Sequence, residues 1–294
     1  MLLDLSTVDG VTLESGRGGM DVVKARTEAA EADIYVFGAH VTHWQPAGQS
    51  PVLFVSDRAV FDGKKAIRGG VPVCFPWFAD HKPSPESPAH GFARTAQWSL
   101  ADAKREGDDA VISLVLVSTE ATRELWPHDF VMTYTIRVGR SLTMTATVTN
   151  VGMEPMDYEL ALHTYFNVAD LATTTVVGFD GGRYIDKPSG GKELEQTGEP
   201  AIEGEIDRIY QDHDREVVID DGTRRIIVGK HGSRSTVLWN PHVEKAAAMG
   251  DFGDDEWKRM LCVETAAIGE HKVHLPPGQS HALEQTVAVS DGGR

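Results

Sequence analysis

Cysteine is scarce in this chain. Only Cys74 and Cys262 occur among 294 residues, too few for a disulfide framework and typical of a protein kept in a reducing compartment. Two cysteines so far apart in the sequence also argue against a zinc site built from cysteine clusters. Long apolar runs are missing as well, since none approaches the roughly 18–20 residues of a membrane-spanning helix. We therefore expect neither a disulfide scaffold nor a membrane partner.

Positive charge is in short supply. The chain has 28 Lys and Arg residues against 44 Asp and Glu residues, a net charge of −16. This balance opposes non-specific nucleic-acid binding, which needs a basic surface. The first residues, MLLDLSTVDG, contain Asp4 and no basic segment, so we expect no export signal and a cytoplasmic location. An anionic substrate would require a local cluster of cations.

Nucleotide and metal motifs are absent too. The sequence contains no G-x-G-x-x-G, no Walker A segment, no G-x-S-x-G and no H-E-x-x-H, which are the usual signatures of dinucleotide, phosphate, acyl-transfer and zinc sites. The pairs His40/His43 and His271/His274 have three-residue spacing without such a frame. We expect no cofactor and no metal ion.

Alternation of apolar and polar residues with a period of two dominates the chain. In residues 141–149, SLTMTATVT, every second residue is apolar, which predicts a strand with one buried face. Helical patterns are confined to 119–126 and 243–250. Strands without βαβ alternation predict an all-β fold, a large antiparallel β-sandwich with few short helices, in a single domain over residues 1–294. Further strand patterns cover 33–38, 51–56, 111–118, 131–138, 235–239, 260–264 and 282–289.

Two strand patterns, residues 161–168 and 260–264, carry the candidate catalytic side chains. In ALHTYFNV, residues 161–168, the period of two places His163 on the same face as Tyr165, opposite the more apolar face. Glu264 ends the strand pattern MLCVE and has the opposite parity from Leu261 and Val263. A histidine on a sheet is more often structural than catalytic. A strand-borne carboxylate paired with a strand-borne imidazole is nevertheless suited to general base and general acid catalysis.

Two loop-like segments add cations and rings. KKAIRGGVPVCFPWF, residues 64–78, has Arg68 before two glycines and several aromatic residues. A guanidinium group matches phosphate oxygens, but from spacing alone a proline-rich crossover with a salt-bridged arginine is the more common explanation of such a segment. HGFAR adds His90 and Arg94 four residues apart. A loop would direct both side chains at one ligand, and a turn with two solvated side chains is the alternative.

Six segments in this order together resemble a known family. From about Gly38 to about Val287 the chain is similar to the glucose-6-phosphate 1-epimerases, the hexose-6-phosphate mutarotase branch of the galactose mutarotase-like (aldose 1-epimerase) superfamily. The segments are AIRGGVPVCFPWF, AHGFAR, LALHTYFNV, IDRIY, LWNPHVEKAAAMGDFGDDEWKRMLCVET and LPPGQSHALEQTV.

The resemblance implies the galactose mutarotase-like supersandwich and interconversion of the α and β anomers of a hexose 6-phosphate, glucose 6-phosphate first. His163 and Glu264 match the family's catalytic pair. The implied substrate-binding residues are Arg68, His90, Arg94 and Asp207, with the arginines nearest the phosphate and Lys64 or Lys65 at the same rim. Some relatives have Gln before HGFAR, where this chain has Ala89, so a hydrogen bond from that position is not expected.

Other functions stay open at this point. A mutarotase of unphosphorylated aldoses would use the same acid and base without the phosphate-binding arginines. A non-catalytic regulator that binds sugar phosphates would need no acid–base pair. A sandwich-fold glycosidase or lyase would usually need two carboxylates rather than His and Glu. The resemblance favours a small-molecule sugar phosphate as the partner and a monomeric protein.

Overall fold

A computed structural model of the chain describes residues 8–291. The first seven residues, for which the sequence predicts no export signal, and residues 292–294 lie outside this range. Within it, no helix is long and apolar enough to cross a membrane. Every pairing between the described strands is antiparallel. The predicted all-β, antiparallel fold is confirmed.

One eight-stranded sheet, here called the site sheet, carries the residues of the candidate site. Its strands occur in the order β15 (Lys192–Glu195), β14 (Arg183–Asp186), β16 (Ile206–Tyr210), β19 (Ser235–Asn240), β20 (Met260–Ala267), β11 (Leu160–Leu162) and β5 (Val73–Cys74), and β12 (Tyr165–Asn167) also pairs with β20. The strand predicted over 161–168 is interrupted at 163–164. The His163 N–H donates to the carbonyl of Pro72, and proline has no N–H to return.

The second eight-stranded sheet, here called the back sheet, confirms most of the other predicted strands. Its order is β13 (Thr175–Val177), β17 (Val217–Asp220), β18 (Arg224–His231), β22 (Ser280–Asp291), β9 (Ser141–Asn150), β8 (Phe130–Val138), β7 (Asp109–Val117) and β6 (Ser99–Glu106). The alternate apolar residues of β9, from Leu142 to Val148, are fully buried as their period predicts.

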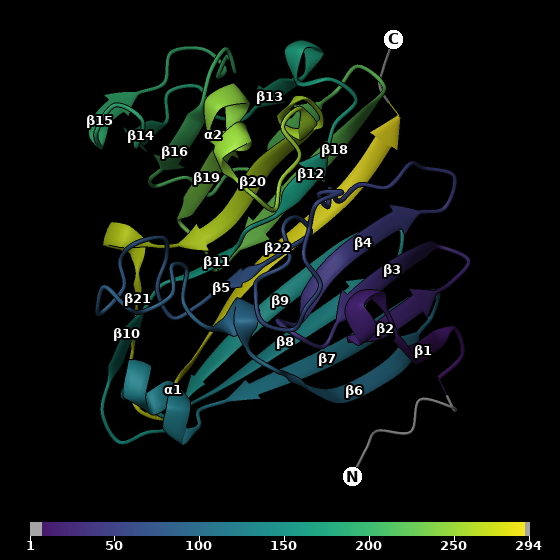
Figure 1. Cartoon of the computed structure of the whole chain (residues 1–294), viewed down its shortest axis with the longest axis vertical. Helices are drawn as coiled ribbons and strands as arrows, with labels where there is room; N and C mark the ends of the chain where they lie inside the picture. The colour runs from purple at the N-terminus through teal and green to yellow at the C-terminus, as the bar shows by residue number, and fades with distance from the viewer. Residues whose placement is uncertain (1–7, 292–294) are drawn as a thin grey trace.

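A third sheet and a few short elements complete the fold (Figure 1). The third sheet consists of β1 (Val11–Ser15), β2 (Asp21–Arg26), β3 (Ala30–Tyr35) and β4 (His40–Pro46), and β10 (Met156–Tyr158) pairs with β21 (Val273–Leu275). The two predicted helices are present as α1 (Glu120–Leu125) and α2 (His242–Ala248). Residues 51–56, predicted as a strand, make only isolated bridges, such as Leu53 with Phe166.

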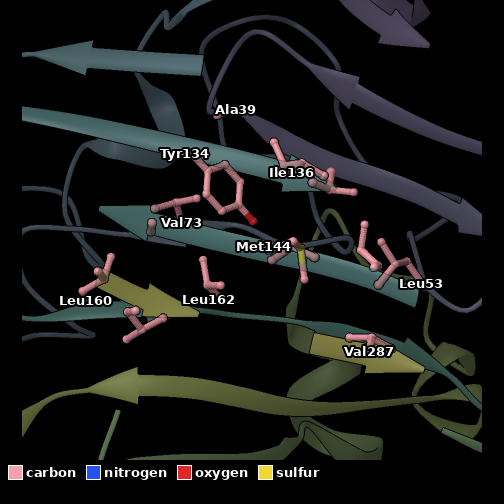
Figure 2. Close-up of a cluster of buried hydrophobic side chains, with 14 of the residues drawn as sticks. Ala39, Leu53, Val73, Tyr134, Ile136, Met144, Leu160, Leu162 and Val287 are labelled. Atoms are coloured by element: carbon pink, nitrogen blue, oxygen red, sulfur yellow. The ribbon is translucent and has the colours of Figure 1, made fainter. Parts of the chain in front are cut away.

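The main core fills the space between the sheets. Leu160 and Leu162 of the site sheet belong to the same buried cluster as Met144 and Val287 of the back sheet (Figure 2). Side chains of the site sheet with the opposite parity, such as Tyr165 and Cys262, belong to a second buried cluster. The sandwich therefore buries one face of the site sheet against the back sheet and leaves the other face to form a site.

Candidate active site

The outer face of the site sheet forms the floor of the site. In the strand register Glu264 of β20 lies opposite Val237 of β19, and Asp207 of β16 lies opposite Trp239 of β19. Because side chains alternate along a strand, Glu264 shares a face with Cys262, and Leu261 and Val263 point into the core. The predicted parity of Glu264 is thus confirmed.

His163 and Glu264 lie next to each other on this floor. His163 Nε2 is 3.3 Å from Glu264 Oε1. The imidazole ring stacks on Tyr165, with centroids 4.8 Å apart and planes 11° apart, and meets the edge of Trp239 at 5.9 Å. Two aromatic rings therefore fix the orientation of the imidazole, as a general acid requires.

Burial sets the protonation of this pair. The Glu264 side chain is 1% exposed and that of His163 is 10% exposed. Loss of hydration raises the pKa of Glu264 well above its usual range and lowers the pKa of His163 well below its usual range. Within residues 8–291, Glu264 Oε2 and His163 Nδ1 are buried without a hydrogen-bond partner. Buried polar atoms without partners are uncommon, so both atoms keep hydrogen-bonding capacity that a ligand could use.

His90 stands beside the pair as a neutral imidazole. Its ring centroid is 5.6 Å from that of His163, and burial lowers its pKa to about 2. The Ala79 N–H donates to His90 Nδ1 at 3.3 Å, and Cys74 Sγ lies 3.4 Å from the same nitrogen. Because Nδ1 accepts, Nε2 carries the proton. His90 is therefore suited to donate a hydrogen bond rather than to transfer a proton.

These residues line a cavity of about 330 Å³, a size suited to one small ligand. Five of the six predicted site residues line it, all except Arg94, and the remaining lining residues include further aromatic, acidic and basic side chains. Its lining consists of Arg68, Phe78, Ala79, Asp80, Ala89, His90, His163, Tyr165, Lys187, Asp207, Val237, Trp239, Lys245, Met249 and Glu264 together.

Arg68 reaches the cavity from the segment before β5. Its Nη1 donates to the Tyr165 hydroxyl at 3.2 Å, and its Nε donates to Asp251 Oδ1 at 3.2 Å. The two following glycines have positive φ angles, and a Cβ on Gly69 would lie 2.4 Å from the carbonyl oxygen of Phe54. The turn that presents Arg68 therefore requires glycine at this position.

Asp207 of β16 and Lys187, which follows the neighbouring strand β14, form a pair on the floor of the site. The Lys187 N–H donates to the Asp207 carbonyl at 3.0 Å, and Nζ lies 4.0 Å from Asp207 Oδ2. Burial raises the pKa of Asp207. Lys245 of α2 adds a second ammonium group, which is bonded to Glu205 at 2.6 Å.

Arg94 lies outside the lining of the cavity. Its Nη2 donates to the carbonyl of Ala89 at 2.9 Å, so it holds the segment that carries Ala89 and His90. Ala89 lines the cavity with a methyl group that offers no hydrogen bond. Lys64 and Lys65 are exposed, and their N–H groups donate to Asp62. The lining residues do not include them.

Sequence reasoning missed Lys187 and Lys245. Lys187 follows the short strand β14, and Lys245 lies in a two-turn helix, so neither belongs to a motif that indicates a ligand. Their place in the cavity lining depends on the strand pairing that brings the end of β14 next to Asp207 and on the tertiary packing that brings α2 to the site. Among residues 8–291, no three His, Cys, Asp or Glu side chains are grouped to hold a metal ion.

Comparison with known proteins places this site in a family. The model of the family described as aldose 1-epimerase matches residues 21–288. The chain is 36% identical over 276 residues to the Escherichia coli (strain K12) protein named "Putative glucose-6-phosphate 1-epimerase", covering 92% of this chain and 91% of that one. It is 35% identical over 260 residues to the Cenchrus ciliaris protein of the same name, covering 84% and 78%.

A solved structure has the same fold over nearly its whole length. The "putative mutarotase (YeaD)" from Salmonella typhimurium matches with a TM-score of 0.91 and 31% identity, covering 99% of this chain and 97% of that one. The family match covers most of the chain and includes every residue of the cavity lining. This chain belongs to the aldose 1-epimerase family.

Proposed function

We propose that this protein interconverts the α and β anomers of a hexose 6-phosphate, with glucose 6-phosphate as the first candidate. The observation that carries the proposal is the buried pair of His163 Nε2 and Glu264 Oε1, 3.3 Å apart, on the floor of a cavity with three cationic side chains. Membership in the aldose 1-epimerase family and the names of the two relatives support the same reaction and substrate.

The reaction needs one base and one acid. Glu264 accepts the proton of the anomeric hydroxyl, through the Oε2 atom that is free of other hydrogen bonds within the described chain. The electron pair of that O–H bond becomes the C1=O bond, the bond from C1 to the ring oxygen breaks, and His163 donates a proton to the ring oxygen. Rotation about C1–C2 exposes the other face, and the ring closes with the two roles reversed. A positioned acid or base contributes about 10²–10⁴-fold each.

Burial favours the state that follows ring opening. Ring opening starts from the ionic form of the pair, a carboxylate and an imidazolium, and ends at the neutral form, a carboxylic acid and an imidazole. Both forms hold the same number of protons. The burial that raises the pKa of Glu264 and lowers that of His163 stabilises the neutral form. The same burial makes the ionic form the minor one in the free protein, so burial speeds ring opening only through the part of the proton transfer that is complete in the transition state.

Positive charge at the cavity suits a phosphate group. Arg68, Lys187 and Lys245 line it in a protein whose net charge is −16. A local cluster outweighs distant charges, because charges beyond a Debye length of about 8 Å are screened at physiological salt. Arg68 is the side chain that we assign to the phosphate, since guanidinium groups bind phosphate oxygens in pairs. Arg94 contributes by holding Ala89 and His90 in place.

The cellular setting completes the proposal. We expect a monomeric cytoplasmic protein, a single domain over residues 1–294, whose partner is a small sugar phosphate and which binds no nucleic acid. The acidic net charge and the two buried, unpaired thiols of Cys74 and Cys262 support this setting.

Comparison of two sugars tests the substrate. We would measure anomer exchange by saturation-transfer NMR on glucose 6-phosphate and on glucose with the wild-type protein. Faster exchange on glucose 6-phosphate supports the proposal, and equal rates on both sugars would instead indicate a mutarotase of free aldoses. Calorimetric binding of glucose 6-phosphate without any faster exchange would indicate a regulator.

A further inference from the structure

A buried amide lies directly behind the acid–base pair. The inward face of β22 consists of Leu283, Gln285 and Val287, all fully buried. Leu283 and Val287 belong to the apolar core between the sheets. Gln285 occupies the position between them, so a polar side chain interrupts an otherwise apolar row.

Gln285 bonds the neighbours of both members of the pair. Its Oε1 accepts a hydrogen bond from Thr164 Oγ1, and Thr164 follows His163. Its Nε2 donates to Thr265 Oγ1 at 3.0 Å and to the Val263 carbonyl at 3.3 Å, and these residues flank Glu264. One amide from the back sheet therefore holds both segments of the site sheet that carry the acid and the base.

The segment of His163 depends on such an anchor. Residues 163–164 belong to neither β11 nor β12, so the strand ladder does not fix them fully. The Val263 N–H reaches the Thr164 carbonyl at 3.3 Å, and the Thr164 hydroxyl reaches Gln285. Because side chains alternate along a strand, Gln285 bonds Thr164 and Thr265 on the face of the site sheet opposite the one that presents His163 and Glu264.

Packing of the core does not require an amide side chain at position 285. A buried polar group is unfavourable unless it is hydrogen-bonded, and an apolar side chain of similar size closes a core equally well. Lys230, the register partner of Gln285, likewise reaches Thr236 Oγ1 at 2.6 Å. Thr236 lies opposite Thr265. A polar row thus runs between the sheets immediately behind the site, and fully bonded polar rows define one arrangement more sharply than apolar contacts do.

We propose that Gln285 is a positioning residue that sets the spacing between His163 and Glu264 from the far side of the sheet. This inference rests on the proposed function. It gives a role to the segment LPPGQSHALEQTV, which contributes no side chain to the cavity lining.

Two substitutions on the same face of β22 separate positioning from stability. Gln285→Met keeps the size of the side chain and removes all its hydrogen bonds, and Val287→Ala opens a cavity without touching them. We expect Gln285→Met to lower kcat by about 10- to 100-fold, because a misplacement of about 1 Å has an effect of that order, with little change in KM. We expect Val287→Ala to lower Tm and leave kcat unchanged. If Gln285→Met does not fold, Thr164→Val removes the hydrogen bond from the other end.

Titration of the pair gives a readout that does not need turnover. Side-chain NMR of His163 and Glu264 across pH should show altered titration in Gln285→Met and unaltered titration in Val287→Ala. Unchanged kcat and titration in Gln285→Met, or an equal loss of kcat in Val287→Ala, would overturn the inference. If the wild-type protein does not accelerate exchange on glucose 6-phosphate, the proposed function fails, and the titration still decides whether Gln285 positions the pair.

Discussion

Replacing Arg68 by methionine tests how the site holds a phosphate group. The substitution keeps much of the aliphatic stem and removes the guanidinium group, which bonds Tyr165 and Asp251 in the free protein. Tyr165 stays in place through its contacts with Trp239, 5.8 Å between centroids, and Phe54, 6.5 Å. The imidazole stacked on Tyr165 should therefore keep its orientation, and the loss should fall on substrate binding.

The size of the loss follows from the kind of bond. A hydrogen bond to a charged group is worth about 1.5–3 kcal/mol, and every 1.4 kcal/mol is a factor of about ten. KM for glucose 6-phosphate should therefore rise by about 10- to 150-fold, and KM for glucose should change little. Arg68→Lys should recover part of the loss, because lysine keeps the charge without the paired donors.

Exchange rates on both sugars measure this effect. Arg58→Met is the matched control, since it removes the same charge from an exposed ion pair with Asp254 outside the cavity lining. It should leave KM for both sugars unchanged. An equal rise of KM for glucose and glucose 6-phosphate in Arg68→Met, or the same effect in Arg58→Met, would refute the phosphate assignment.

Three further predictions concern the frame of the site. Burial lowers the pKa of His40 to about 4 from 6.5. Because the unfolded chain takes up the proton first, the free energy of unfolding should fall by about 3 kcal/mol as pH drops from 6.5 to 4. Urea unfolding of His40→Gln should lack this part of the pH dependence. Gly91 has a φ of +72°, and a Cβ there would lie 2.0 Å from the Phe75 carbonyl oxygen. Gly91→Ala should therefore destabilise the protein by more than about 1 kcal/mol in urea unfolding. An unchanged midpoint of the urea unfolding curve would contradict this. Nitrogen NMR should find the proton of His90 on Nε2 across neutral pH, since the Ala79 N–H occupies Nδ1, and a protonated Nδ1 would exclude the assigned role.

Periodicity predicted the faces of strands well. The period of two in β9 and β20 separates core residues from residues of the outer face, and it placed Glu264 on the outer face correctly. This works because a strand has only two faces, so one buried residue determines its neighbours. The interruption at 163–164 could not be predicted, because it depends on Pro72, which lies 91 positions away in the sequence and faces His163 across the strands.

Loop residues limited the prediction of the site. Motif and resemblance predicted Arg68 and His90, and both line the cavity. Neither motif nor resemblance predicted the cations Lys187 and Lys245. Arg94, which was predicted, lies outside the cavity lining and bonds the Ala89 carbonyl. Side chains from loops and short helices reach a site through tertiary packing, which a single sequence does not encode in any local period.

Anomer exchange on glucose 6-phosphate, measured by saturation-transfer NMR for wild type, His163→Ala and Glu264→Gln, tests whether the buried pair is the acid and base of the reaction. We expect fast exchange in the wild type and a loss of about 10²-fold or more in each variant, with folding unchanged by circular dichroism. Substantial exchange in either variant would show that the buried pair is not the acid and base of the reaction.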